Sequence, residues 1–203
     1  MRLRFLPFLL ILLTFAGFTR GEQADEGLLA QLSARSQTIQ SLQGHFEQQK
    51  TIAVLPVPIS STGRFSFDQG KEVVWETLVP VQSRLKLTPG GIDFADANGE
   101  RKPPAQAQQA GADIVARIFM GVISGELDSL QDYFTLSASG TADDWHIQLV
   151  PRSANLSAYI TRIELDGGEF TEHLNIIEAN GDKTYIVFTT DKVMRKPAAQ
   201  ATP

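Results

Sequence analysis

The chain has 203 residues, with 18 Lys and Arg against 23 Asp and Glu, and it contains no cysteine. The net charge of −5 and the scattered placement of the charged residues argue against a nucleic-acid-binding protein, which needs a basic surface. Without cysteine the chain forms no disulfide bond and carries no lipid-modified N-terminal cysteine, so its fold depends on a hydrophobic core.

The N-terminal segment has the pattern of a secretory signal peptide. Two arginines within the first four residues precede an almost wholly apolar run over residues 5–18, which is shorter than the ~20 residues of a transmembrane helix. Thr19 and Gly21 are small residues at the −3 and −1 positions of a cleavage site, so we predict cleavage near Gly21. The signal peptide predicts export to the periplasm; an uncleaved N-terminal anchor is the alternative. Residues 1–21 contain three arginines and no acidic residue, so the exported chain has a formal charge of −8.

The remaining chain is predicted to form one domain over residues 22–192, followed by a flexible tail over residues 193–203. Leucine and isoleucine recur at helical spacing over residues 25–42 and predict a helix there. A second amphipathic helix is predicted over residues 112–123, and a short one over residues 126–131.

The other segments alternate between apolar and polar residues or are rich in β-branched residues, as strands are. Turn signals rich in glycine, asparagine and aspartate separate them, and Asn180-Gly181 is the strongest of these. The predicted strands are 45–52, 59–67, 73–77, 83–88, 92–94, 134–138, 145–150, 159–165, 170–179 and 184–189.

The order of these elements does not alternate between strand and helix, so a parallel sheet is not expected. We predict an α+β fold that is mainly antiparallel β: one long sheet curled into a half-open β-barrel, with helices covering its concave face. A curled sheet under helices encloses an apolar pocket of the kind that holds lipid.

Catalytic and metal-binding patterns are weak. His45, His146 and His173 lie far apart in the sequence and do not form the spacing of a zinc site. Ser124 comes one position too late for the G-x-S-x-G motif, and it ends a predicted helix. We therefore expect neither an enzyme nor a cofactor or metal; an exported hydrolase, with polar side chains deep in the pocket, is an alternative.

Large apolar side chains are spread over nearly every predicted element. Those on predicted inward faces either fill an ordinary core or line a cavity, and the sequence alone does not separate the two. The candidate cavity lining consists of Phe46, Phe65, Phe67, Trp75, Leu85 and Leu87 from the strands and Ile118, Phe119 and Val122 from the covering helix.

Three features resemble the periplasmic outer-membrane lipoprotein carrier LolA and its relatives. The segment 42–50 (LQGHFEQQK) is similar to the family's first strand, and the segment 61–67 (STGRFSF) is similar to its second strand. Trp75 stands where the third strand usually carries an aromatic residue. The order of meander, helical insert and returning strands extends this resemblance over almost the whole exported chain.

The resemblance implies a monomeric carrier whose partners are acylated cargo such as lipoproteins, an inner-membrane release complex and an outer-membrane acceptor. The alternative is a periplasmic regulatory module that senses lipoproteins with the same pocket between sheet and helices. Typical carriers have an arginine after the second strand that holds a helical lid closed through backbone carbonyls. Gln69 occupies that position, so the resemblance indicates a divergent branch, with Arg64 and Arg84 as substitute gating candidates.

Overall fold

The computed structural model describes residues 20–88, 91–96, 98, 121 and 127–197. Ten antiparallel strands form a single sheet in the order β5-β4-β3-β2-β1-β10-β9-β8-β7-β6. The strands are β1 (Ile39–Thr51), β2 (Ile59–Asp68), β3 (Glu72–Val79), β4 (Ser83–Thr88), β5 (Gly91–Ala95), β6 (Phe134–Thr141), β7 (Asp144–Pro151), β8 (Ile160–Gly167), β9 (Thr171–Glu178) and β10 (Lys183–Arg195).

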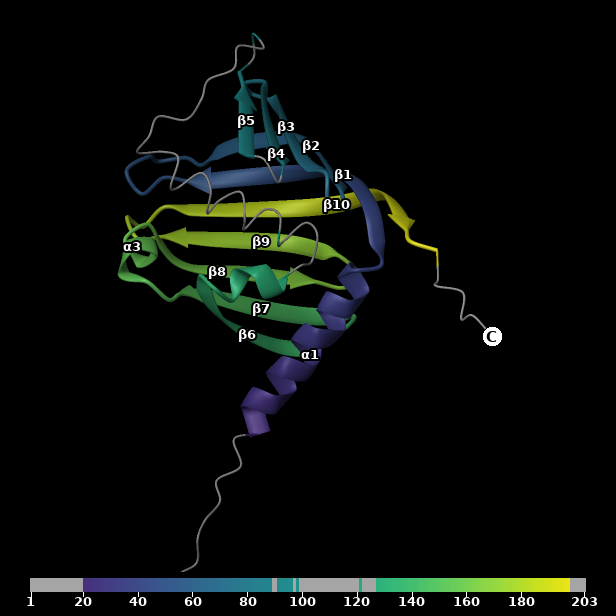
Figure 1. Cartoon of the computed structure of the whole chain (residues 1–203). Helices are drawn as coiled ribbons and strands as arrows, with labels where there is room; N and C mark the ends of the chain where they lie inside the picture. Colours follow the sequence, from purple (N-terminus) through teal and green to yellow (C-terminus); the bar gives the residue numbers. More distant parts are fainter. Residues whose placement is uncertain (1–19, 89–90, 97, 99–120, 122–126, 198–203) are drawn as a thin grey trace, which may run out of the picture.

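Two runs of sequential hairpins make up this sheet, and the pairing of β1 with β10 joins them at its centre. Strands β5 and β6 are its two edges, so the sheet curls without closing (Figure 1). The predicted half-open antiparallel barrel is therefore confirmed.

The described helical segments are α1 (Arg20–Ser36), the 3₁₀ helix η1 (Leu127–Leu130) and the short helix α3 (Ala154–Ser157). Helix α1 packs against β6 and η1, and it buries Leu28, Leu29 and Leu32 there. The helix predicted over residues 112–123 lies outside the described residues, apart from Gly121.

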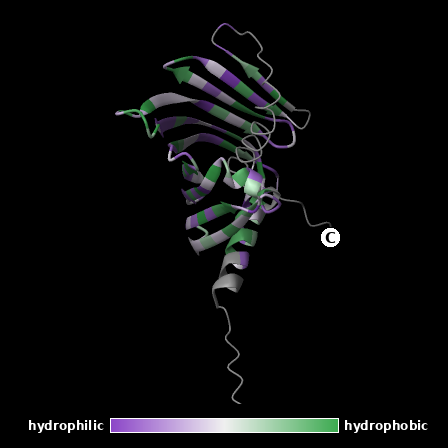
Figure 2. Ribbon diagram, turned by 90° about the vertical axis from the view of Figure 1, so that its left-hand side faces the viewer, coloured by the Kyte–Doolittle hydropathy of each residue, from purple (hydrophilic) through white to green (hydrophobic). Residues whose placement is uncertain are grey.

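The alternation along the strands determines which side chains form the core. Figure 2 shows hydrophobic and hydrophilic residues alternating along the strands. In β2, for example, Phe65 and Phe67 are buried while Arg64 is exposed on the other face, as predicted. The buried apolar residues form one continuous cluster that extends from α1 across the sheet.

The structure corrects the predicted helix over residues 25–42. Helix α1 ends at Ser36, and Ile39 already belongs to β1. A register shift between Ile39 and Ser41 in the pairing with β10 places Ile39 and Leu42, three residues apart, both in the core. Their helix-like spacing therefore comes from a β-bulge.

The C-terminal strand is longer than the sequence predicts. Strand β10 continues to Arg195 because Val193 and Met194 pair with Leu42 and Ser41 of β1. The backbone N–H of Lys196 then donates to the carbonyl of Thr38 at 2.8 Å. Residues 193–195 thus belong to the sheet and not to the predicted tail.

Candidate functional site

Four aromatic rings meet on the core face of the sheet, on the adjacent strands β3, β2, β1 and β10. Phe46 stacks on Trp75 with 3.6 Å between ring centroids and an interplanar angle of 19°. Phe188 contacts the edges of both Phe65, at 5.6 Å, and Trp75, at 6.0 Å. All four side chains are buried. We call Phe46, Phe65, Trp75 and Phe188 the aromatic cluster.

Glycines on the neighbouring strands make this arrangement possible. Phe46 is paired with Gly63 of β2, and Phe65 is paired with Gly44 of β1. A Cβ atom on Gly63 would lie 2.5 Å from Cζ of Phe46, and one on Gly44 would lie 2.6 Å from Cζ of Phe65. Each phenylalanine therefore occupies the space above a glycine.

The other predicted lining residues from the strands lie in the same core. Phe67 and Leu87 are buried, and Leu85 packs partly buried against the core cluster. Ile118, Phe119 and Val122 lie outside the described residues. Phe188 is absent from the predicted lining, although the alternation of buried Ile186 and Phe188 in β10 could have indicated it.

The gating candidates lie away from the aromatic cluster. Arg64 and Arg84 flank Glu76 on the opposite face of the sheet, with nitrogen–oxygen distances of 3.1 and 3.4 Å. Gln69 lies in the turn between β2 and β3, where its backbone N–H donates to the carbonyl of Gln40 at 2.9 Å. A gating role for these three residues stays a prediction.

The same outer face carries a cavity of about 370 Å³ whose lining includes several charged side chains. It includes Arg64, Glu76 and Arg84 as well as Asp191 and Lys192 at the bulged end of β10. Its charged side chains make it unsuited to acyl chains, because an acyl chain over ion pairs would remove water from the charges without replacing its hydrogen bonds.

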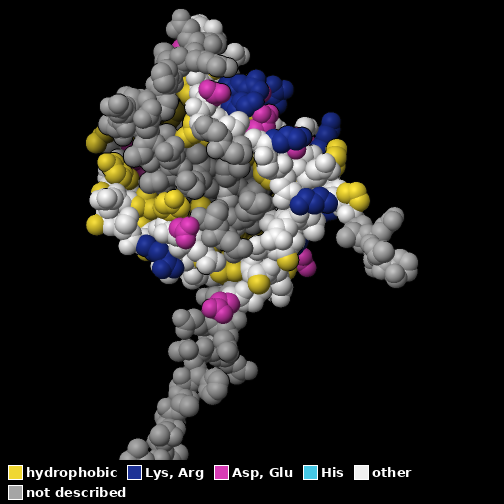
Figure 3. All heavy atoms as spheres, in the orientation of Figure 1, with side chains coloured by type: hydrophobic (Ala, Val, Ile, Leu, Met, Phe, Trp, Pro, Cys, Tyr) yellow, Lys and Arg dark blue, Asp and Glu magenta, His cyan; other side chains and the backbone are white. Residues whose placement is uncertain are grey.

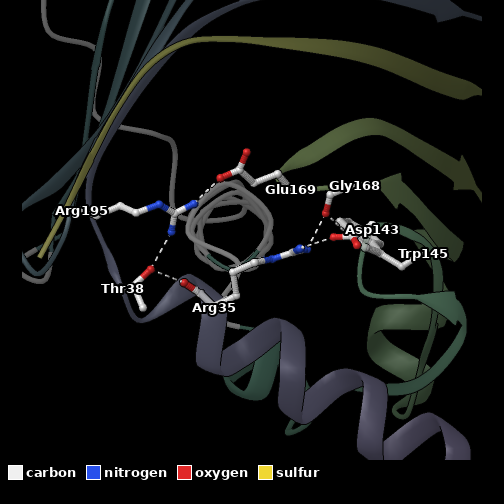
Figure 4. A network of polar contacts seen from close by, with 7 residues as sticks. All are labelled: Arg35, Thr38, Asp143, Trp145, Gly168, Glu169 and Arg195. Carbon is white, nitrogen blue, oxygen red and sulfur yellow. Dashed lines mark hydrogen bonds and ion pairs between the residues drawn. The ribbon is translucent and has the colours of Figure 1, made fainter. Parts of the chain in front are cut away.

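At one end of the sheet, two arginines connect helix α1 and the end of β10 to the turns of neighbouring hairpins (Figure 4). Arg35 of α1 donates to the carbonyl of Gly168, in the β8–β9 turn, and pairs with Asp143 in the β6–β7 turn at 3.4 Å. The indole N–H of Trp145 donates to the same carbonyl at 2.8 Å.

Arg195, at the end of β10, pairs with Glu169 and donates to Oγ1 of Thr38 at 2.6 Å. Thr38 in turn donates to the carbonyl of Arg35 at 2.8 Å. We call Arg35, Arg195 and these partners the arginine clasp. The contacts of Arg35 with Asp143 and Gly168, and of Arg195 with Thr38, join residues more than 100 positions apart in the sequence, so no local pattern indicated them.

Two of the histidines in the described part of the chain pair with aspartates. His45 pairs with Asp191 at 3.1 Å and His146 with Asp166 at 2.7 Å, each at the surface of the sheet. Among the described residues, no group of three His, Asp or Glu side chains could hold a metal ion.

Glu164 of β8 belongs to a half-buried polar network. Burial alone would raise the pKa of Glu164, but hydrogen bonds from Arg162 at 2.6 Å and Asn175 at 2.8 Å, together with the charge of Arg162, hold the pKa below its ordinary value. This network lies on the sheet surface and orders strands β8 and β9.

Residues 37–201 match the model of the family described as outer membrane lipoprotein carrier protein LolA. The chain belongs to the LolA family. No curated protein matches this LolA-family chain significantly. None of its helices within the described residues is long and apolar enough to span a membrane.

Solved structures share the fold of this LolA-family chain at low sequence identity. A crystal structure of MucB is 12% identical over 90% of this chain and 64% of its own, with a TM-score of 0.50. MucB in a complex with MucA from Pseudomonas aeruginosa is 14% identical over 87% of this chain and 59% of its own, with a TM-score of 0.48.

A third structure is an outer membrane lipoprotein-sorting protein domain from Vibrio parahaemolyticus, described as putative. It is 10% identical over 88% of this chain and 95% of its own, with a TM-score of 0.43. This chain thus spans less than two thirds of the two MucB chains.

Proposed function

We propose that this LolA-family protein is a periplasmic carrier. It binds the acyl chains of lipoproteins, or of related lipid-linked cargo, on the core face of its curled sheet and delivers them toward the outer membrane. The observation that carries the proposal is the aromatic cluster, which places four large apolar rings on the four adjacent strands β3, β2, β1 and β10.

The chemistry of this face suits an acyl chain. Each methylene that moves from water to an apolar surface contributes about 0.8 kcal/mol, so a long chain binds without any polar contact. Phe46 and Phe65 pack on glycines, and the four rings of the cluster pack on one another. An acyl chain can replace such contacts with equivalent ones, because they are not directional.

The proposed role is binding and not catalysis. The family is described as a lipoprotein carrier, and the described polar groups pair at the sheet surface, away from the cluster. Cargo would therefore leave the protein chemically unchanged. Release depends on uncovering the cluster, which is buried in this structure.

Binding of a fluorescent palmitate ester to the purified exported protein tests this proposal. We expect saturable binding and recovery of the intact ester. Phe188→Leu should weaken binding about tenfold, because it removes ring contacts in the cluster. Phe134→Leu in β6 is the matched control: Phe134 is also buried, but β6 is four strands away from β10 in the sheet.

Absence of probe binding to the wild-type protein would contradict the proposal. An equal loss of binding in Phe188→Leu and Phe134→Leu would also contradict it, because the loss would then come from lower protein stability and not from the aromatic cluster. Hydrolysis of the ester would favour the exported hydrolase instead.

A sensing module is the second candidate function. MucB, which has the same fold at a TM-score of 0.50, has been solved in complex with MucA, so one relative of this fold binds a protein partner. If the chain is a sensing module, a partner protein, and not an acylated cargo, should co-purify with it from the periplasm. Mass spectrometry of the co-purified material distinguishes the two functions.

A further inference from the structure

One end of the sheet carries exposed apolar side chains on neighbouring loops. Val54 is 87% exposed and Val57 67% exposed in the β1–β2 loop, where Leu55 lies between them. Val79, the last residue of β3, and Val81, in the β3–β4 turn, are exposed, and Tyr159, just before β8, is 73% exposed. We call these six residues the apolar rim.

The loops of the rim form a continuous edge, although they are far apart in the sequence. Val79 pairs with Thr62 of β2, next to the β1–β2 loop. On the other side, the backbone N–H of Ala53 donates to Asp182 at 2.8 Å, and the N–H of Ala179 donates to the carbonyl of Tyr159 at 2.9 Å. In the orientation of Figure 1 this edge lies on the left, where Figure 3 shows hydrophobic side chains gathered.

The composition of the rim loops distinguishes them from ordinary surface loops. No charged residue occurs between Lys50 and Arg64, and none between Glu76 and Arg84. The opposite end of the sheet carries the arginine clasp with its four charged side chains, Arg35, Arg195, Asp143 and Glu169. The tips of the rim loops are therefore apolar, whereas the opposite end of the sheet carries charged side chains in its turns.

These features favour a lipid surface over a protein surface as the partner. The apolar groups are single aliphatic side chains on loop tips, whereas the core of a protein interface is enriched in aromatic residues, methionine and arginine. A backbone N–H group that enters a membrane loses its hydrogen bond to water. Pro56 and Pro58 have no such group, so inserting the β1–β2 loop costs less free energy. An exposed tyrosine such as Tyr159 suits the membrane–water boundary, because its ring is amphipathic.

Charged side chains of both signs lie at the same end of the sheet as the rim. Lys183 pairs with Thr51 at the end of β1, and Arg152 follows β7 at the same end of the sheet; both are exposed. Glu178, which pairs with Lys50 at 2.8 Å, and Asp182 lie at this end as well, so charges of both signs flank the rim, as a zwitterionic headgroup layer requires.

We propose that the apolar rim docks this protein on a phospholipid bilayer, with Val54, Leu55 and Val57 inserting into the headgroup boundary. The contact is reversible, because a few aliphatic side chains bind a membrane only weakly. This docking goes beyond the proposed acyl binding and does not depend on it. A protein that docks in this orientation presents the arginine clasp to the solvent.

Site-specific labelling tests the docking directly. The chain has no cysteine, so a single cysteine at position 54 or 57 can carry an environment-sensitive fluorophore. Met194 is the matched control: it is 57% exposed and apolar, but it lies at the opposite end of the sheet. With phosphatidylcholine vesicles we expect a blue shift of the label in Val54→Cys and Val57→Cys, and none in Met194→Cys.

Substitution tests the same surface without a label. The double variant Val54→Asp, Val57→Asp should lower vesicle binding by at least about tenfold in flotation, while Met194→Asp leaves it unchanged. Both positions are exposed, so the fold is retained, and circular dichroism verifies this. Acyl-probe binding by the double variant should equal that of the wild type.

Three results would overturn the docking proposal. The first is an equal response of the labels at positions 54 and 194. The second is binding that requires added phosphatidylglycerol, which would indicate electrostatic capture instead of apolar insertion. The third is self-association in analytical ultracentrifugation that the double variant abolishes, together with no vesicle binding, which would assign the rim to a second copy of this chain.

Discussion

Glycines determine where the aromatic rings of this sheet lie. Gly63 has no side chain, and the ring of Phe46, which stacks on Trp75, occupies the space above it. The ring of Phe65 occupies the space above Gly44 in the same way. Gly167 has a corresponding role for Trp145, since a Cβ there would lie 2.6 Å from the indole ring. Three glycine–aromatic pairs thus recur on adjacent strands, as in sheets where an aromatic ring covers a glycine.

The first prediction concerns Gly63. The Gly63→Ala variant should lower the free energy of unfolding by about 2–4 kcal/mol, because the added methyl overlaps Phe46 and the backbone at Glu76. Urea denaturation measures the change.

Gly27→Ala in α1 is the control, since a Cβ there meets no atom within 4 Å. It should leave stability unchanged or raise it by up to about 1 kcal/mol. Equal effects of the two substitutions would show that Gly63 is not required by packing.

The second prediction concerns acid stability through Glu164. Its pKa in the folded protein lies below the ordinary value of 4.5, so its hydrogen bonds stabilise the fold above that pH. The stabilisation is lost as the pH falls through the folded pKa. With its side chain 22% exposed, Glu164 should contribute at most about 1 kcal/mol.

Denaturation of Glu164→Gln at several pH values measures this contribution. The variant should be less stable than the wild type at pH 7, and the difference should shrink below the ordinary pKa of 4.5. Glu47→Gln, at an exposed position of β1, should show no such pH-dependent difference. A constant difference at all pH values would assign the effect of Glu164→Gln to packing.

At the scale of elements, the arginine clasp attaches α1 to the sheet. Arg35 reaches turns on two hairpins, and Thr38 links it to Arg195 at the end of β10. Hydrogen bonds from a charged donor are about twice as strong as neutral ones. The clasp therefore attaches the α1–β1 junction to the β6–β7 turn, the β8–β9 turn and the end of β10.

The third prediction is that Arg35→Met loosens α1 locally. The variant retains the apolar stem but loses the bonds to Gly168 and Asp143, so amide hydrogen exchange over residues 28–36 should become about tenfold faster. Arg64→Met, which removes an arginine exposed on the outer face, should leave this exchange unchanged. Equal exchange in both variants would exclude a clasp.

The elements also show where local patterns mislead. Ile39 and Leu42 have helical spacing, but their backbone pairs with β10, about 150 residues away in the sequence. Pairing over thirteen residues outweighs the weak helix propensity of that segment. The extension of β10 beyond Lys192 has the same origin, because β1 supplies its partner.

At the scale of the whole molecule, the β1–β10 pair makes one sheet from two series of hairpins. This pairing brings Phe188 beside Phe46 and so completes the aromatic cluster. It also gathers the arginine clasp at one end of the strands and leaves the apolar rim at the other. The proposed acyl binding and the proposed membrane docking thus use different parts of one sheet.

The sequence by itself determined the strands, their antiparallel arrangement and the inward face of each one. Alternation is a local property, and each hairpin is encoded by a turn and its two flanking segments. It also indicated Phe46, Phe65 and Trp75 as candidate lining residues, and in the structure Phe46 and Phe65 each stack with Trp75.

Only the tertiary structure decided the strand order at the centre, the contribution of Phe188, the arginine clasp and the continuity of the apolar rim. Each of these depends on contacts between residues that are far apart in the chain. The free energy of such a contact depends on which segments meet, and local periodicity carries no information about that choice.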